Sequence, residues 1–187
     1  MTDVHVHMLP AMFEPDEVAG GAAVIIDVLR ASTTMIEALA SGAARVIPCG
    51  SVDEALARRD TLPAGEALLG GERGGVRIDG FDLDNSPRNY PREVVQDRTI
   101  VFTTTNGTAA LRRASRAKEV LIGAFANLSA VERELRRAGL PVHLVCAGTD
   151  GRLTAEDILF AGMLAQRLCR ETDARPPEVP SDMAIEF

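Results

Sequence analysis

Short apolar runs that alternate with segments of helical pattern are the feature that most constrains how this chain can fold. Residues 22–28 (Ala-Ala-Val-Ile-Ile-Asp-Val) form an almost continuous β-branched run, which is typical of a strand buried on both faces. A helical pattern then begins at about Ser32 and ends near Gly42. Further strands are expected at 46–49, 67–71, 99–103, 120–122 and 142–146, and further helices from residue 51 and at about 107–116, 127–137 and 155–170.

Strands separated by helices predict right-handed βαβ crossovers, which place helices on both faces of parallel strands. We therefore predict an α/β fold with a mostly parallel sheet and helices on both faces, in a single domain over residues 1–175. The Pro-rich segment 176–187 is expected to be a stiff tail that leads into an incomplete C-terminal helix. The polar, glycine-rich stretch 70–91 is a long connection, and connections of that length often carry function.

Composition narrows the classes of partner. The net charge of −7 over 187 residues argues against nucleic acid or an acidic membrane, because both bind basic surfaces. No apolar stretch reaches the length of a membrane helix, and the N-terminus lacks the pattern of a signal peptide. Three widely spaced cysteines do not suggest a disulfide framework. These features predict a cytoplasmic protein whose partner is a small anionic molecule; a homodimer is left open.

The first candidate site segment follows the strand at 22–28. A carboxylate such as Asp27 at the end of a buried strand is costly unless it meets a cation or a hydrogen-bond donor. Arg30, Ser32 and Thr33 follow at a helix N-terminus, where hydroxyl groups and free amides form a ready anion site. The alternative is a simple Asp27–Arg30 ion pair with an ordinary helix cap.

The second and third candidate segments follow two later strands. Glu72 and Arg73 lie among glycines that let the backbone approach a ligand, and they supply one metal-type and one anion-type group. Asn106, Gly107 and Thr108 belong to a polar turn that leads from a strand into a helix and could form an uncharged phosphate nest. A flexible surface loop and an ordinary capped turn are the respective alternatives.

The fourth candidate segment follows the strand at 142–146. Cys146 and Arg152 have the Cys-x5-Arg spacing of cysteine phosphatases, but Asp150 would lie inside that phosphate cradle and repel the anion. We therefore interpret Cys146 as a small buried residue rather than a nucleophile. Asp157 follows Thr154 as a cap-like pair, so it is either structural or turned inward towards a metal.

His5 and His7 alternate on one face of an N-terminal strand. Two histidines at that spacing can bind zinc, but no clear third ligand follows them in the sequence. A metal role for this pair is therefore the minor alternative, and a phosphorylated histidine intermediate is less favoured still.

Taken together and in order, five motifs resemble those of the 2-phosphosulfolactate phosphatases. They are residues 24–34 (VIIDVLRASTT), 69–73 (LGGER), 80–87 (GFDLDNSP), 103–108 (TTTNGT) and 146–152 (CAGTDGR). The resemblance implies Mg²⁺-dependent hydrolysis of (R)-2-phospho-3-sulfolactate to 3-sulfolactate and phosphate, a step of coenzyme M biosynthesis. Members of the family usually run some tens of residues further than residue 187.

The resemblance also implies roles for particular residues. Asp27, Glu72 and Asp157 are the carboxylates expected to handle protons, with Asp27 and Glu72 as the metal ligands. Which carboxylate does which task stays open. The residues expected to bind phosphate and sulfonate are Arg30, Ser32, Thr33, Arg73, Asn106, Gly107, Thr108 and Gly148.

Other functions fit the sequence less well. A haloacid-dehalogenase-type phosphatase would need a second aspartate where this chain has Leu29, and a nicotinamide-binding fold would need a G-x-G-x-x-G motif after the first buried strand. Two alternatives remain open: a phosphatase for another small 2-phospho acid, and a phosphate- or sulfonate-binding module without turnover.

Overall fold

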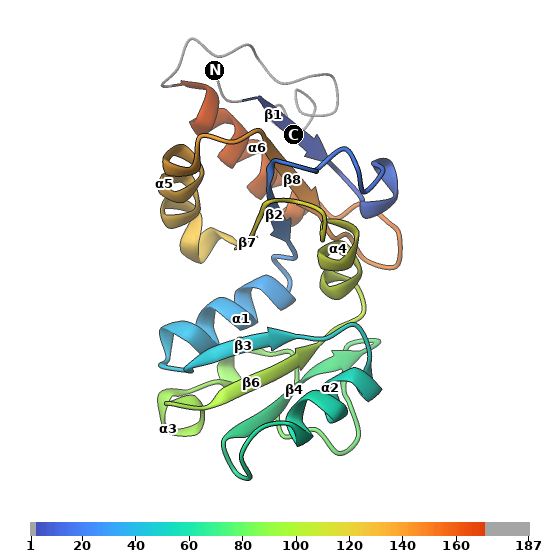
Figure 1. Ribbon diagram of the computed structural model, residues 1–187, viewed down its shortest axis with the longest axis vertical. Coiled ribbons are helices and arrows are strands. Elements are labelled where there is room, and N and C mark those ends of the chain that lie inside the picture. The colour runs from blue at the N-terminus through green and yellow to red at the C-terminus, as the bar shows by residue number, and fades with distance from the viewer. Residues whose placement is uncertain (1–2, 171–187) are drawn as a thin grey trace.

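The computed structural model describes residues 3–170, which form two four-stranded sheets (Figure 1). The first sheet has the order β1-β8-β2-β7, and every pair in it is parallel. Its strands are β1 (Val4–His7), β2 (Ala22–Ile26), β7 (Glu119–Gly123) and β8 (Val142–Cys146). The two central strands, β2 and β8, are buried along their whole length, as the apolar runs predict.

The second sheet has the order β3-β6-β4-β5, in which only the last pair is antiparallel. Its strands are β3 (Arg45–Pro48), β4 (Ala67–Arg73), β5 (Val76–Arg77) and β6 (Thr99–Thr103). Gly71, with φ of 142°, lets β4 approach β6 closely, because a Cβ there would overlap the carbonyl oxygen of Thr103.

Helices connect the strands and cover both sheets. They are α1 (Ala31–Ala40), α2 (Val52–Asp60), α3 (Arg92–Val95), α4 (Gly107–Arg113), α5 (Leu128–Ala138) and α6 (Ala155–Arg170), with short 3₁₀ turns η1 (Pro10–Met12), η2 (Pro87–Asn89) and η3 (Phe125–Asn127). Ser51 caps α2 by accepting a hydrogen bond from the Glu54 amide at 3.1 Å, as its capping-box pattern predicts.

The alternation of side chains along β2 divides the core of the first sheet. Val24 and Ile26 pack with α5 and α6, whereas Ala23 and Ile25 pack with α4 on the opposite face. In the second sheet, α1 and α3 pack on the face that carries Phe102, and α2 packs on the face that carries Val101. Figure 1 shows α1 between the two sheets.

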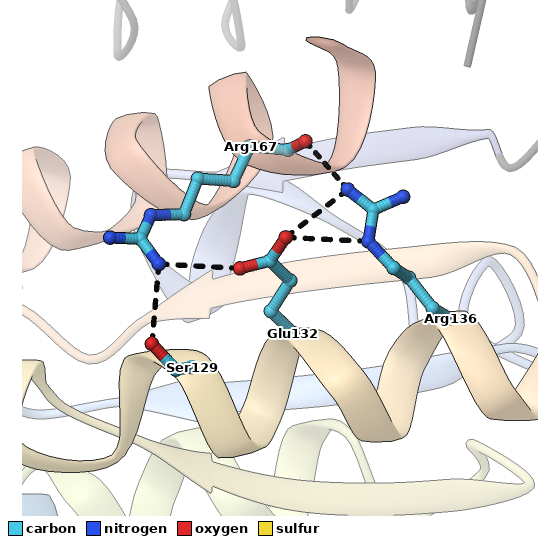
Figure 2. A network of polar contacts seen from close by, with 4 residues as sticks. All are labelled: Ser129, Glu132, Arg136 and Arg167. Carbon is cyan, nitrogen blue, oxygen red and sulfur yellow. Dashed lines mark hydrogen bonds and ion pairs between the residues drawn. The ribbon is translucent and has the colours of Figure 1, made fainter. Parts of the chain in front are cut away.

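The two helices that cover the first sheet are also joined by a polar network (Figure 2). Glu132 of α5 accepts from the Arg136 guanidinium at 3.2 Å and from that of Arg167 of α6 at 3.3 Å. Arg136 in turn donates to the carbonyl oxygen of Arg167 at 2.7 Å, and Arg167 donates to Ser129 at 3.3 Å. Because Arg167 is exposed, the apolar contacts beneath the network contribute more to the α5–α6 packing than these ion pairs do.

The predicted α/β class and the mostly parallel pairing are confirmed. The strands are divided between two sheets because the chain crosses twice. It passes from β2 through α1 to β3, and it returns from β6 through α4 to β7. Helix α4 ends at Arg113, a few residues earlier than expected. No helix within residues 3–170 is long and apolar enough to cross a membrane.

The stretch 70–91, expected to be a long connection, contains the end of β4 and all of β5 and continues along the edge of the second sheet. Leu83 exchanges backbone hydrogen bonds with β4, donating to Leu69 O at 3.0 Å and accepting from the Gly71 amide at 3.1 Å. This contact brings the polar segment after Leu83 to the carboxyl end of β4. The predicted boundary at residue 175 and the tail 176–187 lie outside the described residues.

Candidate active site

Both crossings of the chain occur at the carboxyl ends of the strands, so the predicted site loops of the two sheets meet there. Asp27 follows β2 and lies beside the N-termini of α1 and α4. Glu72, near the end of β4, and Asp157, in the first turn of α6, are both near enough to act on Asp27 electrostatically. The structure therefore brings together the carboxylates that the sequence predicted.

Asp27 is 8% exposed and sits between two helix N-termini. Its Oδ1 accepts a hydrogen bond from the Ala31 amide at 3.0 Å. A Cβ on Gly107 would lie 2.8 Å from its Oδ2, so only glycine lets α4 approach this closely. No ion pair among residues 3–170 joins Asp27 to Arg30, so the simple salt-bridge alternative is not what the structure contains.

The Asp27 carboxyl also has a pKa well above its ordinary value. Burial raises its pKa to about 6, and the negative charges of Asp157 and Glu72 act in the same direction. The backbone amides of Ala31 and Gly107 act in the opposite direction. A buried acid with a pKa near neutrality, at the carboxyl edge of parallel strands, is characteristic of functional sites.

Glu72 fastens the β4–β5 hairpin to the loop that follows β6. Its Oε1 accepts from the Thr105 amide at 2.8 Å, and its Oε2 accepts from the Gly75 amide at 2.7 Å. Arg73 beside it donates to the carbonyl oxygen of Glu72 at 2.7 Å and to the Thr103 hydroxyl at 2.9 Å. Thr105 was not among the predicted site residues, although it lies inside the quoted motif at 103–108.

Asp157 is 2% exposed and links the loop after β2 to the loop after β8. Its Oδ1 accepts from the Val28 amide at 2.9 Å, and its Oδ2 accepts from the Gly148 amide at 3.0 Å and the Thr154 hydroxyl at 2.9 Å. Burial raises the pKa of this carboxyl, and these donors oppose the rise. The cap-like contact with Thr154 is thus present, together with links to the ends of β2 and β8.

The predicted anion-binding hydroxyls are largely engaged within the protein. Ser32 is fully buried, and its Oγ accepts from the Asp27 amide at 3.0 Å. Thr33 donates to the carbonyl oxygen of Val28 at 2.6 Å, and Thr108 accepts from the Thr104 amide at 3.1 Å. These contacts shape the loops around Asp27.

The remaining predicted groups lie at the rim of the site. Arg30 is exposed at the N-cap of α1, and Asn106 is half-buried at the N-cap of α4. Gly148 has φ of 63°, and a Cβ there would overlap the Arg152 carbonyl oxygen and the Leu9 side chain. Asn85, which was not predicted as a site residue, is 7% exposed, and its Oδ1 has no hydrogen-bond partner within residues 3–170.

Cys146 is fully buried at the end of β8. Burial and the neighbouring Asp157 raise the pKa of its thiol far above the usual range, so the thiolate required of a nucleophile is disfavoured. This environment supports the interpretation of Cys146 as a small core residue, packed with β2 and α6.

Residues 8–184 match the family described as 2-phosphosulpholactate phosphatase. The chain belongs to this family. Several relatives carry the name "Probable 2-phosphosulfolactate phosphatase". That of Symbiobacterium thermophilum is 48% identical over 170 residues, covering 91% of this chain and 72% of the relative. Those of Caldanaerobacter subterraneus subsp. tengcongensis and Caldicellulosiruptor saccharolyticus are 44% and 47% identical, over 80% and 75% of this chain. The chain spans 62% and 59% of the length of these two relatives.

The motifs that carry the resemblance to the 2-phosphosulfolactate phosphatases converge in space. The segments 24–34, 69–73, 103–108 and 146–152 meet around Asp27 through the contacts of Ala31, Gly107, Glu72 and Asp157. Residues separated by more than a hundred positions in this 2-phosphosulfolactate phosphatase family member therefore form one site.

A bound metal would have to use few protein ligands. No group of three or more His, Cys, Asp or Glu side chains within residues 3–170 is arranged to hold a metal ion. Mg²⁺ characteristically binds through one or two carboxylates and retains several waters. Asp27 and Glu72, which have no ion-pair partner in the described part of the chain, suit that mode of binding.

Proposed function

We propose that this chain hydrolyses the phosphate ester of (R)-2-phospho-3-sulfolactate, releasing 3-sulfolactate and phosphate, and that the reaction requires Mg²⁺. Membership of the 2-phosphosulfolactate phosphatase family supports the substrate. The observation that carries the proposal is the buried Asp27 carboxyl, held between the N-termini of α1 and α4 and near two further carboxylates.

Asp27 and Glu72 would hold the ion, and bound Mg²⁺ would neutralise phosphate charge and acidify a water molecule. A carboxyl whose pKa is about 6 is mostly ionised at neutral pH and available to a cation, whereas protons compete with the cation for it at and below about pH 6. Asp157 would hold the loops around Asp27 in place, because both its oxygens accept hydrogen bonds from those loops.

Hydrolysis forms a bond between the water oxygen and phosphorus while the bond from phosphorus to the ester oxygen breaks. The attacking water loses one proton, and the leaving alkoxide gains one. The N-termini of α1 and α4, whose Ala31 and Gly107 amides act on the Asp27 carboxyl, would attract the phosphate through their partial positive charge. Arg30 and the amide of Asn106 would bind at the rim, where both remain partly accessible.

A phosphate-release assay tests the proposal. (R)-2-Phospho-3-sulfolactate and other 2-phospho acids are incubated with the protein in Mg²⁺ and, separately, after exhaustive treatment with EDTA. We expect release from phosphosulfolactate in Mg²⁺ and almost none in EDTA. Full release in EDTA would rule out the metal requirement. Anion binding without release from any substrate would favour a binding module.

The family role implies a setting in coenzyme M biosynthesis, which we propose for this chain. We also propose a cytoplasmic location. The odd number and wide spacing of the three cysteines in the sequence support it, because they do not suggest the disulfide framework of an oxidising compartment.

A further inference from the structure

Two arginines lie on neighbouring loops at the edge of the site. Arg30 follows β2 and Arg152 follows β8, and these strands pair directly, with Ile26 opposite Cys146. Both side chains are exposed. Neither guanidinium forms a hydrogen bond or an ion pair with any other residue of the range 3–170. Arg113 and Arg116, by contrast, are each paired with an acidic residue.

The loop that carries Arg152 is a tight hairpin. Thr149 and Arg152 exchange two backbone hydrogen bonds, each of 2.9 Å. Asp150 and Gly151 between them have φ of 50° and 72°, the left-handed conformations that a two-residue hairpin turn requires. The turn therefore fixes the backbone of Arg152, whereas its side chain forms no hydrogen bond or ion pair within residues 3–170.

Hydrogen bonds at both ends of the same hairpin link it to the residues around Asp27. The Asp150 amide donates to the Asn106 Oδ1 at 3.1 Å, and Asn106 directly precedes Gly107, which touches Asp27. At the other end, the Gly148 amide donates to Asp157 at 3.0 Å. Arg152 is thus held beside the site. In the sequence it belongs to the motif 146–152 and has the Cys-x5-Arg spacing, but no role in the proposed reaction was predicted for it.

The charge of the site requires a cation at its rim. The centre contains Asp27, Glu72 and Asp157, and the whole chain has a net charge of −7. A bound metal and the partial positive charge of the helix N-termini would engage the phosphate, so a further anionic group of the substrate would project to the edge. An exposed guanidinium is the group that binds sulfonate or carboxylate oxygens with two parallel hydrogen bonds.

We propose that Arg152, together with Arg30, binds the sulfonate of the substrate and thereby selects 2-phospho acids that carry a further anion on C3, beyond the phosphate and the C1 carboxylate. This inference rests on the proposed phosphatase function and adds a specificity-determining residue to it. Asp150, at the exposed tip of the same hairpin, weakens anion binding there.

The test compares two substrates that differ only in the sulfonate, 2-phospho-3-sulfolactate and 2-phospholactate. We expect Arg152→Met to raise KM for the sulfonated substrate by about tenfold or more, as loss of a charged hydrogen bond does, with kcat little changed. KM for 2-phospholactate should stay within about twofold. Arg152→Lys should recover part of the loss.

Matched variants separate charge from hairpin damage. Asp150→Asn, on the same hairpin, should leave KM for the sulfonated substrate unchanged or lower, and Arg88→Met, an exposed arginine of η2, should change neither substrate. An equal rise in KM for both substrates with Arg152→Met, or no rise at all, would overturn the inference.

A binding measurement keeps this test independent of turnover. Calorimetric titration with 3-sulfolactate should show weaker binding to Arg152→Met than to the wild type, with lactate as the ligand without sulfonate. If the wild type releases no phosphate but this difference persists, the proposed hydrolysis fails and the sulfonate site stands. If the difference is absent, the sulfonate site fails whatever the activity.

Discussion

At the scale of single residues, Asp27 connects stability with function. Its pKa of about 6, against a usual value of 3.8, means that ionising this buried carboxyl costs the folded state free energy. The unfolded chain loses the proton first as pH rises, so stability falls between about pH 4 and 6 and stays lower above that range. The size of the difference corresponds to about 3 kcal/mol at neutral pH.

Replacing this carboxyl by an amide therefore distinguishes its effect on stability from its effect on activity. We expect Asp27→Asn to unfold at an equal or higher urea concentration than the wild type at pH 7.5, with most of the activity lost. At pH 4 the two proteins should differ less, because the folded wild-type carboxyl is then protonated and the cost of ionising it in the folded state is no longer incurred. A lower urea midpoint at pH 7.5 with activity retained would show instead that Asp27 is a structural residue.

Cys146, by contrast, lies in the Cys-x5-Arg spacing of cysteine phosphatases, but we expect it to take no part in catalysis. Its raised thiol pKa and complete burial predict that Cys146→Ala keeps its activity within about tenfold of wild type, whereas removal of a true nucleophile costs several orders of magnitude. The comparison uses kcat at saturating substrate on protein shown to be folded by circular dichroism. Complete loss of activity in folded protein would make Cys146 the nucleophile.

At the scale of elements, the approach of α4 to the end of β2 depends on one glycine. In Gly107→Ala the new methyl group would lie 2.8 Å from the Asp27 Oδ2 and displace the carboxylate or the helix. We expect activity to fall by about tenfold or more, since small displacements of catalytic groups have such effects. Ala109→Gly, at an exposed position of the same helix, controls for weakening of α4. Equal activities in both variants would contradict the close approach.

The edge strand β1 carries a second pH-dependent contact. The His7 Nε2 lies 3.1 Å from the His143 Nδ1 of β8, and His5 stacks on His143 with ring centroids 4.9 Å apart. Burial lowers the pKa of both His7 and His143 to about 4. The folded protein therefore keeps these rings neutral. Although His143 lies beside both His5 and His7, no group of three or more His, Cys, Asp or Glu side chains within residues 3–170 is arranged to hold a metal, so the zinc alternative gains no support.

This contact predicts a loss of stability in mild acid. The unfolded chain takes up protons near pH 6.5 while folded His7 and His143 resist them, so stability falls as pH drops from about 6.5 towards 4. Urea unfolding at pH 7.5 and pH 5 should show a smaller loss for His7→Gln than for the wild type. Comparing the two proteins cancels the opposite contributions of Asp27 and Asp157. Identical losses of stability in the two proteins would show that His7 does not contribute to this pH dependence.

At the scale of the whole molecule, the local sequence pattern predicts where strands and helices lie but does not predict which strands pair in one sheet. The β-branched run at 22–28 and the apolar spacing of α6 were sufficient to place a buried strand and a long helix. The assignment of strands to two sheets was not predictable, because it depends on where α1 and α4 pack. The predicted residues around Asp27 do converge, whereas the inward hydrogen bonds of Ser32 and Asp157 required the three-dimensional contacts.

We propose that the two sheets meet to form a cation site at Asp27 that hydrolysis requires. Calorimetric titration of Mg²⁺ into the wild type and Asp27→Asn, at pH 7.5 and pH 5, tests it most directly. We predict that the wild type binds Mg²⁺ at pH 7.5 and more weakly at pH 5, where protons compete for the carboxyl of pKa about 6. Asp27→Asn should bind weakly at both. Equal, pH-independent binding by the two proteins would contradict the claim.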